Sequence, residues 1–383
     1  MAAHRQDPAV PARRARSAAP ATIAEVAAEA GVGKATAARA LGNYGAVSPD
    51  ARARVLAAAE KLRYRPNSLA RSMTTGVTQT IGVIVADISN PFFAGVIRGI
   101  ADALDATQYT AIVLSADEKL AKEKAAVGVL MDKQVDAIIL ASAALLPDQT
   151  EHILEAMSRN IPIVLIDRKV RGLDLDAVVI NNREAARDAV RRFVELGHRR
   201  IGFVWGPAVR DGARDRAGVL AAAEIRLWSE TERLRGYTEA LDEAGIPFDP
   251  VLVTSCDHNE EATVGAFGAM LALPDPATAV LTTETDALVG TLRAIRDAGL
   301  KHPDDISIIG FDDSSWASVM APPLTMIAQP MLELGRAAAR HALARITGDD
   351  FDVVVETIPA ALVPRASLAP PRAPAGVTAG GGR

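Results

Sequence analysis

Residues 22–41 constrain the fold of this chain more than any other segment. They read Thr-Ile-Ala-Glu-Val-Ala-Ala-Glu-Ala-Gly-Val-Gly-Lys-Ala-Thr-Ala-Ala-Arg-Ala-Leu. Four apolar side chains recur at helical spacing, which predicts one buried helix face: Ile23, Val26, Ala27 and Ala30. Gly31 follows them and suits the positive φ that often ends a helix. The pattern therefore predicts a helix, a tight turn and a second short helix.

The second helix carries side chains suited to DNA. We expect Lys34, Thr36 and Arg39 to point outward from it while Val32 is covered. A short helix that presents basic and hydroxyl groups beyond a tight turn is typical of a helix-turn-helix reader of the major groove. An ordinary helical pair with a glycine turn is the alternative interpretation.

The charge distribution favours the DNA-binding interpretation. Residues 1–75 contain twelve basic and five acidic side chains, whereas the remainder contains thirty basic and forty-two acidic ones. A basic head on an acidic body suits a head that is attracted to phosphates.

A third helix is expected after residue 47. Ser48 is a good N-cap and Pro49 suits the first helical position. The predicted core-facing residues are Val55, Leu56, Ala59 and Leu62, and Pro66 ends the helix. Residues 67–73 are expected to form a short hinge helix.

This head resembles the DNA-binding domain of the lactose-repressor (LacI/GalR) family of bacterial transcription regulators. The resemblance extends along nearly the whole chain through motifs at residues 80–93, 196–202, 232–237, 309–313 and 322–325. It implies an all-α helix-turn-helix head joined by a hinge to a two-subdomain α/β core like that of periplasmic binding proteins.

The resemblance also implies a set of DNA-binding positions. They are Thr22, Lys34, Ala35, Thr36, Arg39, Asn67, Ala70 and Met73. The chain departs from the family pattern at Gly33 and Ala38, where serines are usual, and at Ala37 and Ala40, where valines are usual. Met73 replaces the hinge leucine that wedges into the minor groove in this family. These departures should weaken some backbone contacts and alter base preference.

The body of the chain alternates apolar runs with helical patterns, which is typical of parallel sheets covered on both faces. The body contains about 300 residues, which is more than a single sheet with its covering helices usually holds, so two subdomains are expected. Expected helices include residues 92–106 and 183–196. The predicted strands are residues 81–86, 110–114, 137–141, 163–166, 177–180, 201–205, 251–254, 279–281 and 306–310. The predicted domains are a disordered basic arm (1–20), the head (21–66), hinge and linker (67–79), the core (80–368) and a disordered tail (369–383).

Ligands in such folds bind beyond the carboxyl ends of the strands. Several polar and aromatic residues are expected there, among them Asp87 and Asp313. By the resemblance, the effector-pocket positions are Phe93, Asp167, Arg168, Arg233, Thr285, Asp312 and Trp316. Thr285 departs from the asparagine that is common there. An aspartate after a strand can instead cap the next helix.

Residues 208–231 form an insertion relative to the family pattern. Its alanine-rich part, residues 217–228, is expected to be helical. The insertion directly precedes Glu232 and Arg233, so it can form a lid over the cleft. A solvated surface insertion is the alternative interpretation.

The predicted protein is a cytoplasmic, homodimeric DNA-binding regulator, most simply a repressor, rather than an enzyme. No run of about twenty apolar residues predicts a membrane span, and the first twenty residues do not read as a secretory signal. A single cysteine, Cys256, excludes a disulfide within the chain, and no metal or cofactor is expected. The expected effector is a sugar or sugar acid, with a nucleobase as the alternative. A solute-binding protein and a sugar-handling enzyme are the competing functions.

Overall fold

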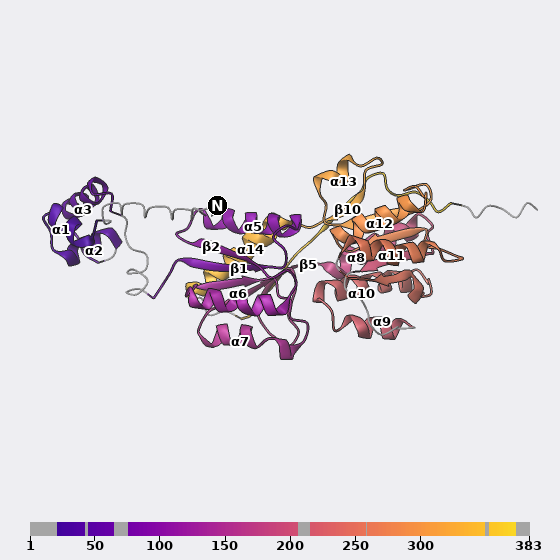
Figure 1. Cartoon of the computed structure of the whole chain (residues 1–383), viewed down its shortest axis with the longest axis horizontal. Coiled ribbons are helices and arrows are strands. Elements are labelled where there is room, and N and C mark those ends of the chain that lie inside the picture. The colour runs from indigo at the N-terminus through magenta and orange to yellow at the C-terminus, as the bar shows by residue number, and fades with distance from the viewer. Residues whose placement is uncertain are drawn as a thin grey trace, which may run out of the picture. The chain divides into compact units, whose positions relative to one another are not determined.

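The computed structural model describes residues 21–42, 45–64, 76–205, 215–257, 259–348 and 352–372. The chain divides into two compact units, Met1–Thr78 and Gln79–Arg383, and each is described by itself. Figure 1 shows the head in indigo and the core from purple to yellow.

The part of the head that the structure describes contains three short helices: α1 (Ile23–Glu29), α2 (Lys34–Gly42) and α3 (Pro49–Lys61). Thr22 caps α1, since its hydroxyl accepts from the Glu25 amide at 3.4 Å. The Glu25 carboxylate accepts in return from the Thr22 amide at 2.6 Å, which completes a capping box. Gly31 has a φ of +62°, as the predicted turn requires.

The helix-turn-helix prediction is confirmed, and one buried position was wrong. Ser48 caps α3 and Pro49 opens it, as expected. The core of the head contains Val26, Ala27, Ala30, Ala37, Ala40, Val55, Ala58 and Ala59. Leu56 was expected in this core, yet it is 51% exposed. The buried stripe runs through residues 51, 55, 58 and 59, so residue 56 lies about 100° of helix rotation away from Val55.

The first subdomain of the core is a six-stranded parallel sheet with helices on both faces. Its strand order is β11-β5-β4-β3-β1-β2. Helices α5 and α14 cover one face, and α6 and α7 cover the other. The elements are β1 (Thr80–Val85), α5 (Pro91–Leu104), β2 (Thr110–Ser115), α6 (Leu120–Asp132), β3 (Ala137–Leu140), α7 (Glu151–Ser158), β4 (Ile163–Ile166), β5 (Asp176–Ile180), α14 (Met331–Ile346) and β11 (Val355–Ile358).

The second subdomain repeats this architecture with the strand order β12-β10-β9-β8-β6-β7. All its strand pairs are parallel except β10 with β12. The elements are α8 (Asn182–Glu195), β6 (Ile201–Trp205), α9 (Arg216–Ala223), α10 (Trp228–Glu243), β7 (Val253–Ser255), α11 (Glu260–Leu271), β8 (Ala279–Thr282), α12 (Thr285–Asp297), β9 (Ser307–Phe311), α13 (Ser315–Val319), β10 (Thr325–Ala328) and β12 (Ala361–Val363).

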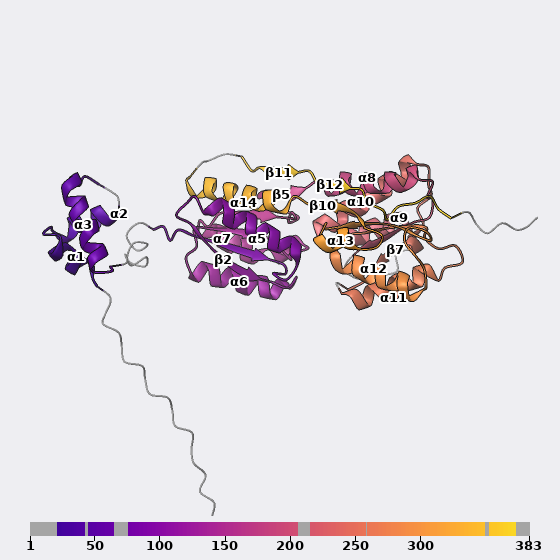
Figure 2. The same ribbon diagram turned by 90° about the horizontal axis from the view of Figure 1, so that it is seen from above.

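The chain passes between the subdomains three times: from β5 to α8, from β10 to α14 and from β11 to β12. Figure 2 shows yellow α14 beside purple α5, although the two helices lie far apart in sequence. The nine predicted strands are present with shifts of one or two residues at their ends. Strands β10, β11 and β12 were not predicted.

The ordered core also extends past the predicted boundary at residue 368. The Ala369 carbonyl lies 2.8 Å from His198 Nε2, and the Ala369 amide donates to Ser307 Oγ at 3.0 Å. Residues 369–372 are therefore part of the core rather than of a disordered tail. None of the helices in the described ranges is long and apolar enough to cross a bilayer.

Glycines allow α5 and α14 to approach closely. A Cβ added to Gly335 would lie 2.0 Å from the Val96 carbonyl oxygen, and one added to Gly99 would lie 2.1 Å from the Leu332 carbonyl oxygen. Both obstacles are backbone atoms, which cannot rotate away. The face of the first sheet beneath these helices therefore depends on two residues without side chains.

We expect Gly335→Ala to destabilise the core by about 1–3 kcal/mol, the usual cost of overpacking. Urea denaturation of the whole chain measures the change. Gly265→Ala in α11 is the matched control, because a Cβ there meets no atom within 4 Å. Alanine also favours a helix over glycine, so the control should be neutral or stabilising. Equal stability of the two variants would contradict the close-approach argument.

Candidate functional site

A small cavity lies where the carboxyl ends of the two sheets face each other. Its residues follow β1, β2 and β4 in the first subdomain and β8, β9 and β10 in the second, with others from α5 and α10. Its volume is about 70 Å³. This is the place where open α/β sheets bind ligands.

The first subdomain contributes an ion triad in which Arg168 and Asp167 are buried and Glu118 is half-buried. Arg168 Nε donates to Asp167 at 2.8 Å, and Arg168 Nη1 donates to the Glu118 carboxylate at 2.9 and 3.0 Å. Burial alone would lower the pKa of Arg168, but the charges of Glu118 and Asp167 raise it above its usual range. The guanidinium is thus held in one position by two carboxylates that themselves border the cavity.

The second subdomain contributes Arg233 from α10. Its Nε donates to Asn182 Oδ1 at 2.8 Å, and its Nη1 donates to the Thr283 carbonyl. The guanidinium carbon lies 4.1 Å from the centre of the Phe311 ring, a cation–π contact. Arg233 is therefore oriented before any ligand arrives.

Asp312 lies at the carboxyl end of β9 and is paired with Gln329, which follows β10. Gln329 Nε2 donates to Asp312 Oδ1 at 2.6 Å. Burial raises the pKa of Asp312 to about 6, and the opposing influence of Arg233 only partly offsets it. The other amide atom, Gln329 Oε1, is buried and has no hydrogen-bond partner within the described ranges. A ligand that donates a hydrogen bond would satisfy it.

Three of the acidic cavity residues have left-handed backbone conformations. The φ values of Glu118, Asp167 and Asp312 are +52°, +70° and +67°. Such conformations are unfavourable for residues other than glycine and cluster at functional sites. Asp167 and Asp312 occupy equivalent places, each directly after a buried parallel strand of its own sheet.

The structure brings together five of the seven predicted effector positions: Phe93, Asp167, Arg168, Arg233 and Asp312 line the cavity. Thr285 begins α12 and does not line it, whereas its neighbour Glu284 does. Trp316 packs against the hydrophobic cluster under α12 and lines a separate hollow. The contact of Thr285 and Trp316 with an effector stays a prediction, and neither residue lines the cavity.

Two further aspartates have structural partners instead. Asp87 accepts from the Ser89 amide and hydroxyl, and Asp313 pairs with Arg365. The sequence reasoning missed Glu118, Leu227, Ser229, Glu230, Glu284 and Gln329 as cavity residues. The carboxyl-end rule could have flagged Glu118 and Glu284, because each follows a predicted strand, whereas Gln329 follows β10, which was not predicted.

The insertion is helical over a shorter range than predicted. Helix α9 ends at Ala223, and Trp228 begins α10 rather than ending the insertion's helix. Leu227, Ser229 and Glu230, between and after these points, line the cavity. This segment of the insertion therefore borders the site instead of lying on a remote surface.

The predicted DNA-binding residues of the head occupy different positions. Thr22 caps α1. Lys34 and Ala35 are exposed at the start of α2, and Thr36 and Arg39 are half-buried. Arg39 Nε donates to the Ala35 carbonyl at 3.3 Å, so its side chain runs back along the helix. Asn67, Ala70 and Met73, with the predicted hinge helix, lie outside the described residues.

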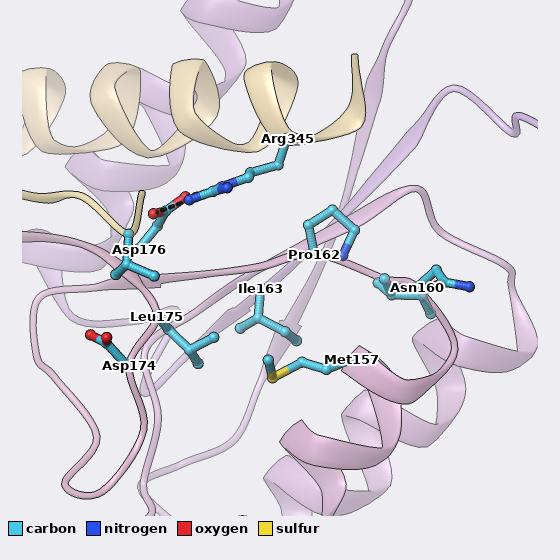
Figure 3. A pocket seen from close by; sticks show the side chains of 10 residues that line it. Met157, Asn160, Pro162, Ile163, Asp174, Leu175, Asp176 and Arg345 are labelled. Carbon is cyan, nitrogen blue, oxygen red and sulfur yellow. Dashed lines mark hydrogen bonds and ion pairs between the residues drawn. The ribbon is translucent and has the colours of Figure 1, made fainter. Parts of the chain in front are cut away.

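A second hollow of about 390 Å³ lies at the opposite end of the first sheet (Figure 3). It is bordered by apolar side chains such as Met157 and Leu175, and by the Asp176–Arg345 ion pair. That pair is saturated within the protein, since Asp176 also accepts from the Val354 amide. Among the described residues that border this hollow, no buried side-chain polar atom lacks a partner, whereas Gln329 Oε1 lacks one at the first cavity.

The fold and cavity define a helix-turn-helix regulator with a ligand-binding core. Residues 22–67 match the model of bacterial regulatory proteins of the lacI family, and residues 190–368 match a periplasmic binding protein-like domain. The chain belongs to the LacI family. It is a DNA-binding transcriptional repressor regulated by a small molecule.

Its relatives are similar over most of their length. The repressor CytR of Escherichia coli (strain K12) is 35% identical over 82% of this chain and 86% of its own. Catabolite control protein A of Priestia megaterium is 30% identical over 85% of this chain and 92% of its own. The lac repressor dimer bound to operator and an anti-inducer has a TM-score of 0.77 at 25% identity, covering 92% of this chain and 100% of that one. These relatives are transcription regulators rather than enzymes.

The raised pKa of Asp312 predicts a pH-dependent stability. Between the ordinary aspartate pKa and about 6, the folded state keeps a proton that the unfolded state releases, so stability falls as pH rises through this window. The amide introduced by Asp312→Asn cannot ionise, so this variant does not lose folding stability in this way as pH rises. The stability of this variant relative to wild type should therefore increase by about 1–2 kcal/mol from pH 4.5 to 7.5.

Urea denaturation at both pH values measures the difference. The exposed Asp148 is the control position, and Asp148→Asn should keep the same stability relative to wild type at the two pH values. An Asp312→Asn difference that is constant with pH would show that Asp312 is not held protonated in the folded state.

Proposed function

We propose that this repressor binds an operator as a homodimer through α2 and that an effector in the cavity between the subdomains controls this binding. The proposal that an effector binds here rests on the groups that meet in one cavity. They are two oriented guanidiniums, two aspartates with left-handed backbone conformations and one buried hydrogen-bond acceptor. The basic head and the exposed start of α2 support the DNA half. One short reader helix gives little contact, which favours a dimer on two half-sites.

The effector that suits the cavity best is a neutral sugar. Asp167, Asp312 and Gln329 Oε1 offer acceptors for hydroxyl donors, and Phe93 offers an apolar wall. The cavity suits a sugar acid less well. Arg168 is already occupied by two carboxylates and Arg233 by two oxygens of the protein.

Two structural neighbours support the sugar class. One is described as the regulator CelR in complex with cellobiose, at 29% identity with a TM-score of 0.65. Another, from Enterococcus faecium, is described with bound ribose, at 28% identity with a TM-score of 0.63. A nucleobase stays the alternative, because Phe92 and Phe93 together form an aromatic wall.

The cavity must open to admit a ring. A volume of about 70 Å³ corresponds to about two water molecules. Effector binding is therefore coupled to a change in the distance between the subdomains, and this change supplies the differential affinity that allosteric control requires. The proposed place of action is the cytoplasm, where operator DNA is accessible; a solute-binding role for transport would leave the head without a purpose.

Arg39→Ala and Lys34→Ala should each weaken specific operator binding by roughly ten- to hundred-fold, because a good base contact is worth about 1–3 kcal/mol. The operator is first selected from a random DNA pool with the wild-type dimer, and binding is then measured by fluorescence anisotropy. Lys133→Ala removes an equal charge from the exposed end of α6 and should leave affinity unchanged. Unaltered affinity and base preference in Arg39→Ala would refute the reader-helix assignment.

Asp312→Ala should weaken effector binding by roughly ten- to hundred-fold, because it leaves Gln329 and the ligand donor without a buried partner. A thermal-shift screen with cellobiose, ribose, glucuronate and adenine identifies the chemical class, and calorimetric titration gives the affinities. Arg159→Ala on the exposed end of α7 serves as the control. Equal affinity of Asp312→Ala and wild type for the identified ligand would place the effector elsewhere.

A further inference from the structure

Arg171, in the loop between β4 and β5 of the first subdomain, reaches across to the second. Its Nη1 donates to the Arg226 carbonyl, and its Nη2 donates to Thr231 Oγ1 at 2.8 Å. Its Nε lies 3.7 Å from the Glu224 carboxylate. All three partners belong to residues 223–231, which run from the last residue of α9 through the first turn of α10. This segment is here called the bridge.

The bridge is tied together at the point that Arg171 holds. The Thr231 hydroxyl lies 2.6 Å from the Ala223 carbonyl, to which it donates, and it accepts from Arg171. One hydroxyl thus joins the end of α9, the first turn of α10 and the opposite subdomain. Loss of the guanidinium removes the partner that spans the cleft but leaves the bond within the bridge.

An apolar contact accompanies these polar ones. Trp228, the first residue of α10, packs against the hydrophobic cluster of the first subdomain, beside which Leu173 also packs. Leu173 lies two residues after Arg171 in the same loop. The bridge therefore meets the first subdomain through two contacts: the hydrogen bonds from Arg171, and the packing of Trp228 against the hydrophobic cluster.

The bridge also borders the cavity. Leu227, Ser229 and Glu230 line it from the second subdomain, and Glu118 and Arg168 line it from the first. Each of the three lies within four residues of an atom that Arg171 binds. Fixing the bridge to the loop therefore fixes this wall of the cavity.

We infer that Arg171 is a positioning residue for the effector cavity, and that its bonds to the bridge hold the cavity closed in the ligand-free protein. The effector enters when the hydrogen bonds between Arg171 and the bridge break. The strength of these bonds therefore sets the rate at which a ligand reaches the cavity and the shape that the ligand must match. The inference rests on the proposed effector site for its biological meaning. The closing contact itself can be measured without an effector.

The experiment uses the full-length protein carrying Ser229→Cys, a buried position that lines the cavity. A small thiol reagent labels the protein without ligand, and peptide mass spectrometry gives separate rates for residue 229 and for Cys256. Cys256 is buried in the second subdomain and reports general loosening. Arg171→Gln should speed labelling at residue 229 by at least ten-fold and change Cys256 less than two-fold.

Two variants sharpen the comparison. Arg159→Gln alters an exposed ion pair within α7 and should have no effect on either rate. Arg171→Lys keeps a charge near Glu224 but cannot engage two separate acceptors as a guanidinium can, so its rate should be intermediate. Hydrogen exchange of residues 223–231 should rise in the same order.

Three outcomes would overturn the inference. The first is an unchanged labelling rate at residue 229 when Arg171→Gln is introduced. The second is an equal acceleration of labelling at residue 229 and at Cys256. The third is that, in the protein that keeps Arg171, residue 229 is labelled as fast as in the unfolded protein. None of them bears on whether Asp312 contacts an effector, which is measured separately by titration. Failure of the closing contact and failure of the effector site are thus distinguishable.

Discussion

The candidate site depends on one geometric constraint: two parallel sheets present their carboxyl ends to each other. Each buried strand delivers its next residue to the same cleft, so Asp167 and Asp312 meet although 145 positions separate them. The apolar runs of both sheets suit strands that are buried on both faces, as the strands of parallel sheets are. Desolvation of the cleft then gives its charged groups their properties, including the raised pKa of Asp312.

Much of this architecture could be predicted because long buried strands leave a clear pattern in sequence. The nine predicted strands are mostly continuous apolar runs. Strand β11 escaped notice because it lies at a sheet edge and alternates exposed Val355 with partly buried residues. Leu56 was misplaced because apolar character alone does not fix which side of α3 a residue occupies.

The cavity was harder to predict than the fold. Asp167, Arg168 and Arg233 were identified through family resemblance, which carries three-dimensional information that one sequence lacks. Glu118 and Gln329 belong to no local motif, and their meeting requires the complete strand order of both sheets. The contact of Trp316 with an effector stays a prediction, because a residue four positions after Asp312 can turn away from the cavity into the packing beneath α12.

The three passages of the chain between subdomains also determine the order of events during synthesis. Among the described residues, the hydrophobic core of the head lies within residues 23–64 and includes no side chain of either subdomain. The first subdomain, by contrast, needs α14 and β11, which the ribosome adds only at residues 331–358, after almost all of the second subdomain. Until then the apolar side chains of α5 and of the sheet face that α14 covers lack their native cover. A nascent chain therefore carries a finished DNA reader long before the domain that regulates it can fold.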